Sequence, residues 1–328
     1  MKKLFLISMA ATAMLAGCSN DETLDVVQQK AIDFTSFVDK STKAAQDVTT
    51  DNLTAISVYG WRSTLDQSPT TIQIFNAQDV TKTNGAWGYT PIQYWEANYK
   101  YAFEAIAPKS GEKGVTFTAA QAGGTISFVS DAETDLVYDK VADITTPATI
   151  TSMNAVSFTM DHMLSRVMFT FKNGFPSTSI ANIDIEDVKI TNAHSEGTIT
   201  PETESYWTPA KNNDQVKVAT VAFDVTNNTN LVPSTGTCAS EHKYLLPVEN
   251  ASYTVTFKVT LKQGNATTEY DCSSNISISL ARGKSYNFVA TINPANLGAA
   301  PIEFTATVTD WGNYTSSDVP DYAPAAQQ

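Results

Sequence analysis

Histidine and cysteine, which often hold metals or carry out catalysis, are scarce in this 328-residue chain: it has three of each. The histidines, at positions 162, 194 and 242, are scattered, and no Cys/His spacing typical of a zinc site occurs. The stretch Gly283-Lys284-Ser285 lacks the earlier glycine of a phosphate loop, since Ile278 stands there, and no Gly-x-Ser-x-Gly motif is present. We therefore predict no catalytic residues, no metal and no cofactor.

Basic residues are also few. The chain has 21 Lys and Arg against 34 Asp and Glu, a formal net charge of −13. Such a surface repels nucleic acid and anionic lipid, which attract basic patches. The acidic residues between Asp131 and Asp139 lack the glycine and the spacing of a calcium loop, so a solvated segment is favoured over a calcium site.

Long apolar runs are missing, except for one near the start. Residues 4–14 are apolar but too short to span a bilayer as a helix, and Lys2 and Lys3 precede them. This order, with the small residues of Leu15-Ala16-Gly17 at its end, is typical of a secretory signal peptide. Cys18 follows directly, as in the lipobox of bacterial lipoproteins. We predict cleavage between Gly17 and Cys18 and lipidation of the Cys18 thiol; the alternative is an ordinary signal peptide with a chance cysteine.

The other two cysteines are Cys238 and Cys272. An exported protein meets an oxidising compartment, in which such a pair can form a disulfide. Two cysteines far apart in a folded domain can equally remain free, and the sequence leaves both alternatives open.

Helical periodicity is nearly absent, and apolar and polar residues instead alternate with period two, as in half-buried β-strands. The segments predicted as strands are 32–35, 56–61, 99–107, 115–117, 126–128, 166–171, 183–190, 253–261, 276–280, 286–292 and 302–308. One short helix is expected within 131–143, and a hairpin turn at Arg282-Gly283-Lys284. Many short strands with turns between them predict an all-β protein built of antiparallel sandwiches.

The length exceeds that of one ordinary core, so we expect two sandwich domains. The predicted organisation is a signal peptide at 1–17, a polar tether at 18–30, an N-terminal domain at 31–152, a C-terminal domain at 153–312 and a flexible tail at 313–328.

Aromatic residues allow two interpretations. Trp61, Trp87, Tyr89, Tyr94, Trp95 and Trp207 could stack on sugar rings, but in a sandwich most aromatic side chains fill the core. Core packing is favoured for each, although Trp87 and Trp95 bracket a stretch with glycine and proline that is a candidate for exposure.

Several segments, in order, resemble the fimbrillin family of Bacteroidetes pilins. They are the lipobox, Ile32-Asp33-Phe34, Lys40-Ser41-Thr42-Lys43-Ala44, Ile56-Ser57-Val58-Tyr59-Gly60, Asp135-Leu136-Val137-Tyr138, His162-Met163-Leu164-Ser165-Arg166-Val167, Leu245-Leu246-Pro247, Gly283-Lys284-Ser285-Tyr286 and Val308-Thr309-Asp310-Trp311-Gly312. The matches run from residue 15 to about 312, nearly the whole chain.

The resemblance implies two transthyretin-like sandwich domains and a lipidated precursor that reaches the outer membrane surface. A protease would cut between Lys43 and Ala44, although the family usually has arginine there, and the strand with Ile32 and Phe34 would be lost. A neighbour's C-terminal segment would fill the gap. The implied partners are other fimbrial subunits, outer membrane lipid and a host or bacterial surface receptor, in a fimbrium that supports adhesion.

The candidate donor strand comprises Ile302, Phe304, Ala306 and Val308. The same residues could instead be the last strand of their own domain, so both alternatives stay open. The rival interpretation of the whole chain is a cell-surface glycan-binding lipoprotein that uses exposed tryptophans.

Overall fold

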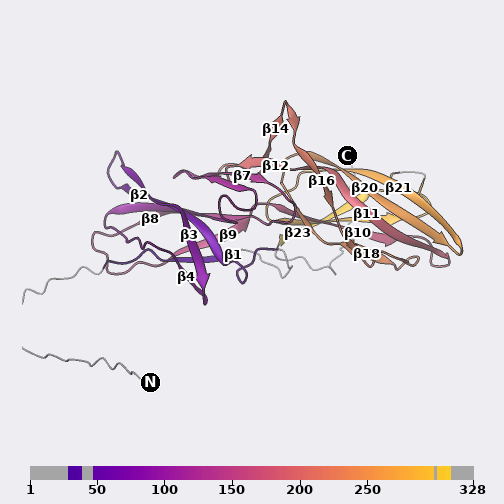
Figure 1. The fold of residues 1–328 in the computed structure, drawn as a ribbon, viewed down its shortest axis with the longest axis horizontal. Coiled ribbons are helices and arrows are strands. Elements are labelled where there is room, and N and C mark those ends of the chain that lie inside the picture. The colour runs from indigo at the N-terminus through magenta and orange to yellow at the C-terminus, as the bar shows by residue number, and fades with distance from the viewer. Residues whose placement is uncertain (1–28, 39–46, 299–300, 312–328) are drawn as a thin grey trace, which may run out of the picture.

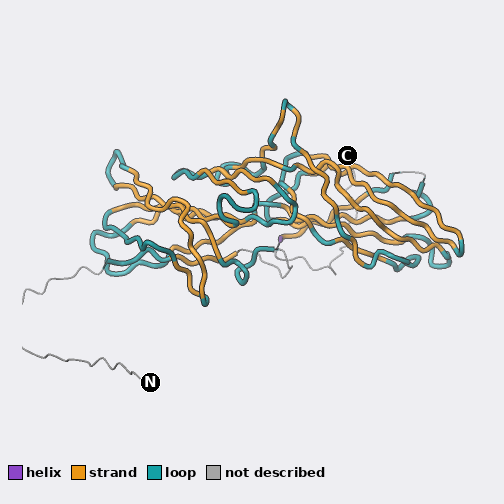
Figure 2. The backbone as a smooth tube through the Cα atoms, viewed as in Figure 1, coloured by secondary structure: helices purple, strands orange, loops and turns teal. Residues whose placement is uncertain are grey.

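The structure is a computed structural model that describes residues 29–38, 47–298 and 301–311. Within these residues all regular secondary structure longer than a single turn is β-strand. They contain no α-helix, and hence no helix that could span a membrane. The molecule is elongated, with the strands of the first half at one end and most of those of the second half at the other (Figures 1 and 2). The predicted all-β fold of antiparallel sandwiches is confirmed.

A seven-stranded sheet forms the N-terminal end, in the order β1-β9-β8-β5-β2-β3-β4. Its strands are β1 (Phe34–Val38), β9 (Val156–His162), β8 (Val137–Thr145), β5 (Tyr99–Ala107), β2 (Ala55–Thr64), β3 (Thr71–Thr83) and β4 (Ala86–Gly88). All neighbours are antiparallel except β1 and β9, which are parallel. The sheet curls around a core of its own, since Phe34 of β1 contacts Phe75 of β3, with ring centroids 5.4 Å apart.

A second layer covers the other face of this sheet. It has the order β13-β12-β7-β6, with β13 (Thr208–Pro209), β12 (Glu196–Ile199), β7 (Thr125–Val129) and β6 (Val115–Thr118). Tyr59 of β2 packs on Phe117 of β6, with centroids 4.9 Å apart. Because β7 pairs with β12, this layer joins strands from both halves of the chain.

Two further sheets form the C-terminal end. One has the order β17-β18-β10-β22-β23, with β19 also paired to β10; the other has the order β16-β11-β20-β21. Their bounds are β10 (Ser165–Asn173), β11 (Ala181–His194), β16 (Val218–Ala222), β17 (Val225–Thr226), β18 (Thr237–Ser240), β19 (Lys243–Leu245), β20 (Ala251–Gln263), β21 (Ala266–Ile278), β22 (Lys284–Ile292) and β23 (Phe304–Asp310). A small pair, β14 (Lys211–Asn212) and β15 (Gln215–Val216), projects beside them.

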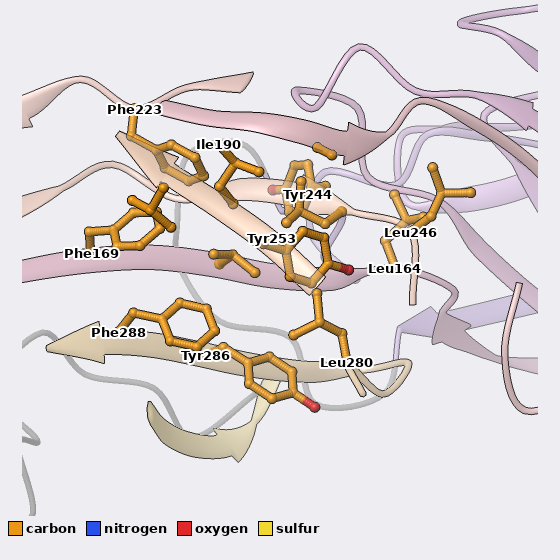
Figure 3. Close-up of a cluster of buried hydrophobic side chains, with 14 of the residues drawn as sticks. Leu164, Phe169, Ile190, Phe223, Tyr244, Leu246, Tyr253, Leu280, Tyr286 and Phe288 are labelled. Carbon is orange, nitrogen blue, oxygen red and sulfur yellow. The ribbon is translucent and has the colours of Figure 1, made fainter. Parts of the chain in front are cut away.

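The two C-terminal sheets face each other across an aromatic core. Phe171 of β10 lies 5.0 Å from Phe257 of β20, and Phe169 lies 4.8 Å from Phe223, between centroids. Figure 3 shows the side chains of Phe169, Phe223 and Phe288 gathered in this core. The alternation of Tyr253, Val255, Phe257, Val259 and Leu261 is explained, since all five are buried.

Two local expectations are wrong. No helix lies in 131–143, because the Asp131 carboxylate accepts the N–H groups of Glu133 and Thr134 in a turn, and β8 follows. The turn at Gly283 does not make a hairpin either: β21 and β22 belong to different sheets, so the chain crosses between layers there.

The change of sheet along the chain falls after His162, because β9 pairs with β1 and β8. The division into domains at residues 152 and 153 stays a prediction. The transthyretin-like connectivity likewise stays what the resemblance implies.

Candidate functional site

β1 is an edge strand of the seven-stranded sheet. It runs parallel to β9, from Phe34 opposite Val156 to Val38 opposite Met160. β8 pairs with β9 only at Val137 and Tyr138, so β1 supplies the strand pairing for most of β9. An edge strand held on one side by its ladder can leave without breaking the interior of a sheet.

The inward side chains of this segment fill a pocket of aromatic rings. Ile32, Phe34 and Val38 are 0%, 4% and 6% exposed, whereas the outward Phe37 is 52% exposed. Four rings surround that of Phe34 at centroid distances of 5.4–5.9 Å; they belong to Phe75, Tyr89, Phe103 and Phe158. We call this pocket, with the β9 backbone beside it, the β1 groove. Such a groove suits an extended segment with large apolar residues at alternate positions.

One inward position departs from this pattern. Ser36 is only 3% exposed, and its hydroxyl has no hydrogen-bond partner among the residues that the structure describes. A buried hydroxyl without a partner lowers stability, because it has lost its hydrogen bonds to water. The Ser36 hydroxyl is therefore the one inward group of β1 that weakens its binding in the groove.

Residues 89–95 hold the start of the segment from the other side. Ile32 N–H donates to Gln93 O, and Trp95 N–H donates to Lys30 O, both at 2.9 Å. The Tyr89 hydroxyl donates to Ile32 O at 2.7 Å. Burial raises the pKa of Tyr89, so the hydroxyl stays protonated and remains a donor at neutral pH.

The chain is anchored again directly after the segment 39–46. Asp47 is fully buried; it pairs with Arg166 and accepts a hydrogen bond from the Tyr244 hydroxyl at 2.8 Å. Arg166 also donates to Trp311 O at 3.0 Å and to the Ser285 hydroxyl at 2.8 Å. This anchor does not involve β1, so the chain from Asp47 onward keeps its own attachment.

Aromatic stacking completes the anchor. The Trp311 ring stacks on His162 and on Tyr244, with ring centroids 4.2 Å and 5.5 Å away, and both rings are nearly parallel to it. Asp135 holds His162 Nδ1 at 2.9 Å and accepts Val48 N–H at 2.8 Å. We call these residues, Asp47, Asp135, His162, Arg166, Tyr244 and Trp311, the junction cluster. Sequence reasoning missed it as a unit, although three of the segments that resemble the fimbrillin family, 135–138, 162–167 and 308–312, supply Asp135, His162, Arg166 and Trp311.

The candidate donor residues lie in their own domain here. β23 pairs with β22, Ile302 is 3% exposed and Phe304 packs on Phe169, with centroids 5.3 Å apart. Val308 is 49% exposed. The structure thus has the second of the two alternatives for this single chain, and the donor role stays a prediction.

The remaining predicted residues separate into two groups. Gly17, Cys18, Lys43 and Ala44 lie outside the described residues. Cys238 on β18 and Cys272 on β21 are free thiols on different sheets, so the structure does not pair them. Burial raises the pKa of Cys238 to about 12 and that of Cys272 to about 11, and both thiols therefore remain protonated at neutral pH.

The aromatic platform of a glycan-binding site is not formed by the tryptophans. Trp61, Trp95, Trp207 and Trp311 are buried, and Trp87 is half-buried with Lys82 Nζ 5.9 Å from its ring. Trp95 lies in the core, as favoured, and its ring packs on Tyr101 and Phe103. The stretch between Trp87 and Trp95 is largely exposed. Among the described residues, no group of three or more His, Cys, Asp or Glu could hold a metal ion.

Comparison with known proteins identifies the family. The sequence matches the fimbrillin-like family over residues 42–311, most of the chain, and the protein belongs to this family. Because this family is fimbrillin-like, a cell-surface fimbrium and other fimbrial subunits are the expected setting and partners. The predicted resemblance is confirmed. No curated protein matches the sequence.

Several solved structures are similar to the chain at low identity. A candidate cell adhesion protein from Bacteroides uniformis ATCC 8492 is 16% identical, with a TM-score of 0.46 over 86% of this chain and 99% of that one. One from Bacteroides ovatus ATCC 8483 is 13% identical, with a TM-score of 0.49 over 86% and 98%. The fimbrial anchor protein Mfa2 from Porphyromonas gingivalis is 10% identical, with a TM-score of 0.37 over 86% and 98%.

Proposed function

We propose that this chain is a structural fimbrial subunit that is exported as a lipoprotein precursor and assembles by donor-strand exchange after proteolysis. Cleavage between Lys43 and Ala44 frees β1, and a strand from another subunit replaces it. The polymer supports adhesion of the cell to a host or bacterial surface receptor.

The observation that carries the proposal is the position of β1. It is an edge strand, its alternate side chains fill the β1 groove, and the chain is anchored separately at Asp47. A cut in the segment between Val38 and Asp47 therefore separates β1 from the body without touching either attachment.

The vacated groove would be a strong template for another strand. The N–H and C=O groups of β9 would lose their partners, and the rings around Phe34 would meet water. Burying three side chains such as Ile32, Phe34 and Val38 contributes roughly 5–9 kcal/mol gross. We call the cleaved segment that carries β1, residues 18–43, the leader. It is accordingly expected to leave when another strand replaces it, rather than by simple dissociation.

Membrane attachment belongs to the precursor. Acyl chains on Cys18 would hold the chain on the outer membrane until cleavage, since several chains on one residue make a durable anchor. Labelled palmitate should enter the wild-type precursor and not the Cys18→Ser variant, and labelling of the variant would contradict lipidation at this residue.

The N-terminal sequence of the mature surface protein tests the proposal. We expect the subunits of wild-type fimbriae to begin at Ala44. The Lys43→Gln variant should remain a cell-bound precursor, without fibres in electron micrographs. Lys40→Gln, three residues earlier, is the matched control and should assemble normally. Fibres built from subunits that retain residues 18–43 would contradict the proposal.

A further inference from the structure

The C-terminal end of the molecule has a long sheet edge that is open on one side. β21 is the last strand in the order β16-β11-β20-β21, and all 13 of its residues face residues of β20 (Figure 1). On its other side it pairs with no strand of the described residues. Strands in globular proteins usually have about 5–6 residues. An exposed edge of this length is a template for a further strand.

The hydrogen bonds of β20 show which backbone groups of β21 face outward. Thr254 N–H donates to Asn192 Oδ1 at 2.7 Å, and Asn192 Nδ2 donates to Ser252 C=O at 2.9 Å, so both backbone groups point at β11. Thr254 and Ser252 lie opposite Asn275 and Ser277. In an antiparallel ladder, facing residues either bond to each other or direct their backbone groups away from each other, in alternation. Asn275 and Ser277 therefore direct their N–H and C=O groups away from β20, toward the open side.

The two halves of this edge differ in protection. The first half carries Glu269 and Asp271, and charged side chains on an edge strand discourage pairing. The loop with Gly298 also packs on it, since a Cβ on Gly298 would lie 2.8 Å from the ring of Tyr270. Residues 272–278 have no charge, no proline and no glycine. We call residues 272–278 the open edge.

The core-facing side chains of the open edge are apolar and incompletely covered. Cys272, Ile276 and Ile278 pack on the large core but are only half-buried, whereas Phe257, opposite Cys272 on β20, is 3% exposed. A further strand at this edge would cover these side chains. Removing their apolar surface from water favours the binding of such a strand.

We propose that the open edge pairs with the open edge of a second copy of this chain, in an antiparallel ladder centred on Asn275. Ser273 of one copy then faces Ser277 of the other, and the two Asn275 residues face each other. The two four-stranded sheets join into one sheet that runs through both molecules. The contact goes beyond the proposed strand exchange, because neither copy gives up a strand and the two copies lie side by side.

The side chains fit this register on both faces of the joined sheet. On the core-facing side, Ile276 packs beside Ser274 of the other copy and Ile278 beside its Cys272. On the outer side, the Thr254 hydroxyl donates to Asn275 Oδ1 at 3.0 Å, and the amide N–H groups of Asn275 remain for the facing Asn275. Because the contact has two-fold symmetry, each favourable pair occurs twice.

The acidic residues select the same register. Centred on Asn275, the ladder places Asp271 opposite Ser279 of the other copy, and Glu269 lies beyond the open edge. A ladder centred on Asp271 would set two carboxylates directly opposite each other, which is destabilising. The uncharged half of β21 is therefore the half that pairs.

The experiment uses the uncleaved chain from Ser19, in which β1 stays in place, so that strand exchange does not contribute. Sedimentation equilibrium under reducing conditions measures the dissociation constant of the dimer. We expect a reversible dimer that tightens as salt is added, because each copy has a formal net charge of −13 and salt screens their repulsion. A chain that remains monomeric up to its solubility limit would overturn the inference. A dimer that salt weakens would do the same, because the open edge has no ion pairs to screen.

Two lysine substitutions on the same strand test the location. Asn275→Lys places two ammonium groups opposite each other and should weaken the dimer about tenfold or more. Thr267→Lys is the matched control: it changes the charge equally at an exposed position of β21 outside the open edge, and should dimerise as wild type does. Equal dimerisation by Asn275→Lys and wild type would overturn the inference.

A disulfide trap tests the register in a Cys272→Ser background. Asn275→Cys should crosslink to a second copy of itself under mild oxidation, because the two facing Cα atoms of a hydrogen-bonded pair lie about 5.5 Å apart, within disulfide reach. Ser273→Cys and Ser277→Cys should crosslink only when the two variants are mixed. Crosslinking of either variant alone, without the mixed product, would overturn the register.

The same variants keep this inference separate from the proposed function. Asn275→Lys leaves β1 and its groove unchanged, so cells that carry it should still build fimbriae, seen singly rather than side by side in electron micrographs. Fimbriae of this variant that associate side by side as wild-type fimbriae do would overturn the inference and leave the proposed strand exchange standing.

Discussion

Arg166 joins three distant parts of the chain through one buried side chain. It pairs with Asp47, donates to the Ser285 hydroxyl at the start of β22 and donates to Trp311 O at the end of β23. A buried charge is tolerated only where such partners satisfy it. The start of the body after the predicted cleavage bond and the end of the last strand are thus held by the same guanidinium group.

Glu104 is a second buried ionisable side chain, and it has fewer hydrogen-bond partners than Arg166. Its Oε1 accepts Gly124 N–H at 2.6 Å and the Tyr138 hydroxyl at 2.8 Å, while Oε2 has no partner among the described residues. Burial raises the pKa of Glu104, and these hydrogen bonds oppose the rise only in part. The Glu104 carboxyl group therefore binds its proton more tightly in the folded chain than in the unfolded chain.

The first prediction concerns the pH dependence of stability at this residue. The stabilising effect of the tightly held proton is complete below the ordinary glutamate value of 4.5 and is lost as pH rises toward the raised folded pKa. Glu104→Gln, which keeps an acceptor for Gly124 and Tyr138, should gain stability relative to wild type between pH 4.5 and 7. Urea denaturation across this range measures the gain. Parallel profiles would contradict it, and the exposed Glu112→Gln is the control.

At the scale of the element, β1 combines firm packing with a replaceable attachment. Its inward side chains are buried as deeply as those of interior strands, yet it pairs with β9 alone. Parallel pairing needs no hairpin to β9, so the strand is connected to the rest only through its own continuation. This arrangement allows one cut to convert a covalent strand into a bound ligand.

The second prediction follows from the two faces of β1. Phe34→Ala removes a ring that contacts four others and should cost about 3–5 kcal/mol of stability. After cleavage of the folded chain, the leader should leave about 100-fold faster or more, because each 1.4 kcal/mol is a tenfold change. Release is measured by size-exclusion chromatography of a labelled leader.

Phe37→Ala is the matched control on the same strand. Its side chain is 52% exposed, so it should alter the release rate little. If both variants release the leader at the wild-type rate, the aromatic pocket does not hold β1.

At the scale of the whole molecule, the two ends are not independent bodies. β7 pairs with β12 from Val129 opposite Glu196 to Ile126 opposite Ile199, and Phe128 lies 6.1 Å from Trp207 between centroids. The larger core contains residues from both halves of the chain. A shared sheet and a shared core therefore join the two ends of the molecule.

The third prediction is that the body unfolds as one cooperative unit. Wild type should give a single calorimetric transition, whereas Phe128→Ala should cost about 3–5 kcal/mol and separate the transitions of the two ends. Val129→Ala, next in sequence but 54% exposed, is the control and should keep one transition. Two transitions in the wild-type chain would contradict the prediction.

The strands that the sequence predicts are those rich in apolar residues. The segment 253–261 alternates cleanly because β20 buries every second residue. The segments 166–171 and 286–292 lie within β10 and β22, which are buried along most of their length. β3 was not predicted, since most of its residues are exposed and carry little periodic signal. The segment 131–143, for which the sequence predicts a short helix, contains the start of β8, where the buried Val137 and Tyr138 lie between acidic residues.

The sequence by itself determined the all-β class and the family, because alternation and local motifs depend on neighbouring residues. It also predicted the lipoprotein signal and the strand that contains Ile32 and Phe34. Only the tertiary structure decided that β1 runs parallel to β9, that β21 and β22 part into different sheets, and that Asp47, Arg166 and Trp311 meet. The contacts of β1 with β9 and of Arg166 with Asp47 and Trp311 join residues more than a hundred positions apart. Like the separation of β21 from β22, they depend on how the layers pack, which no local pattern encodes.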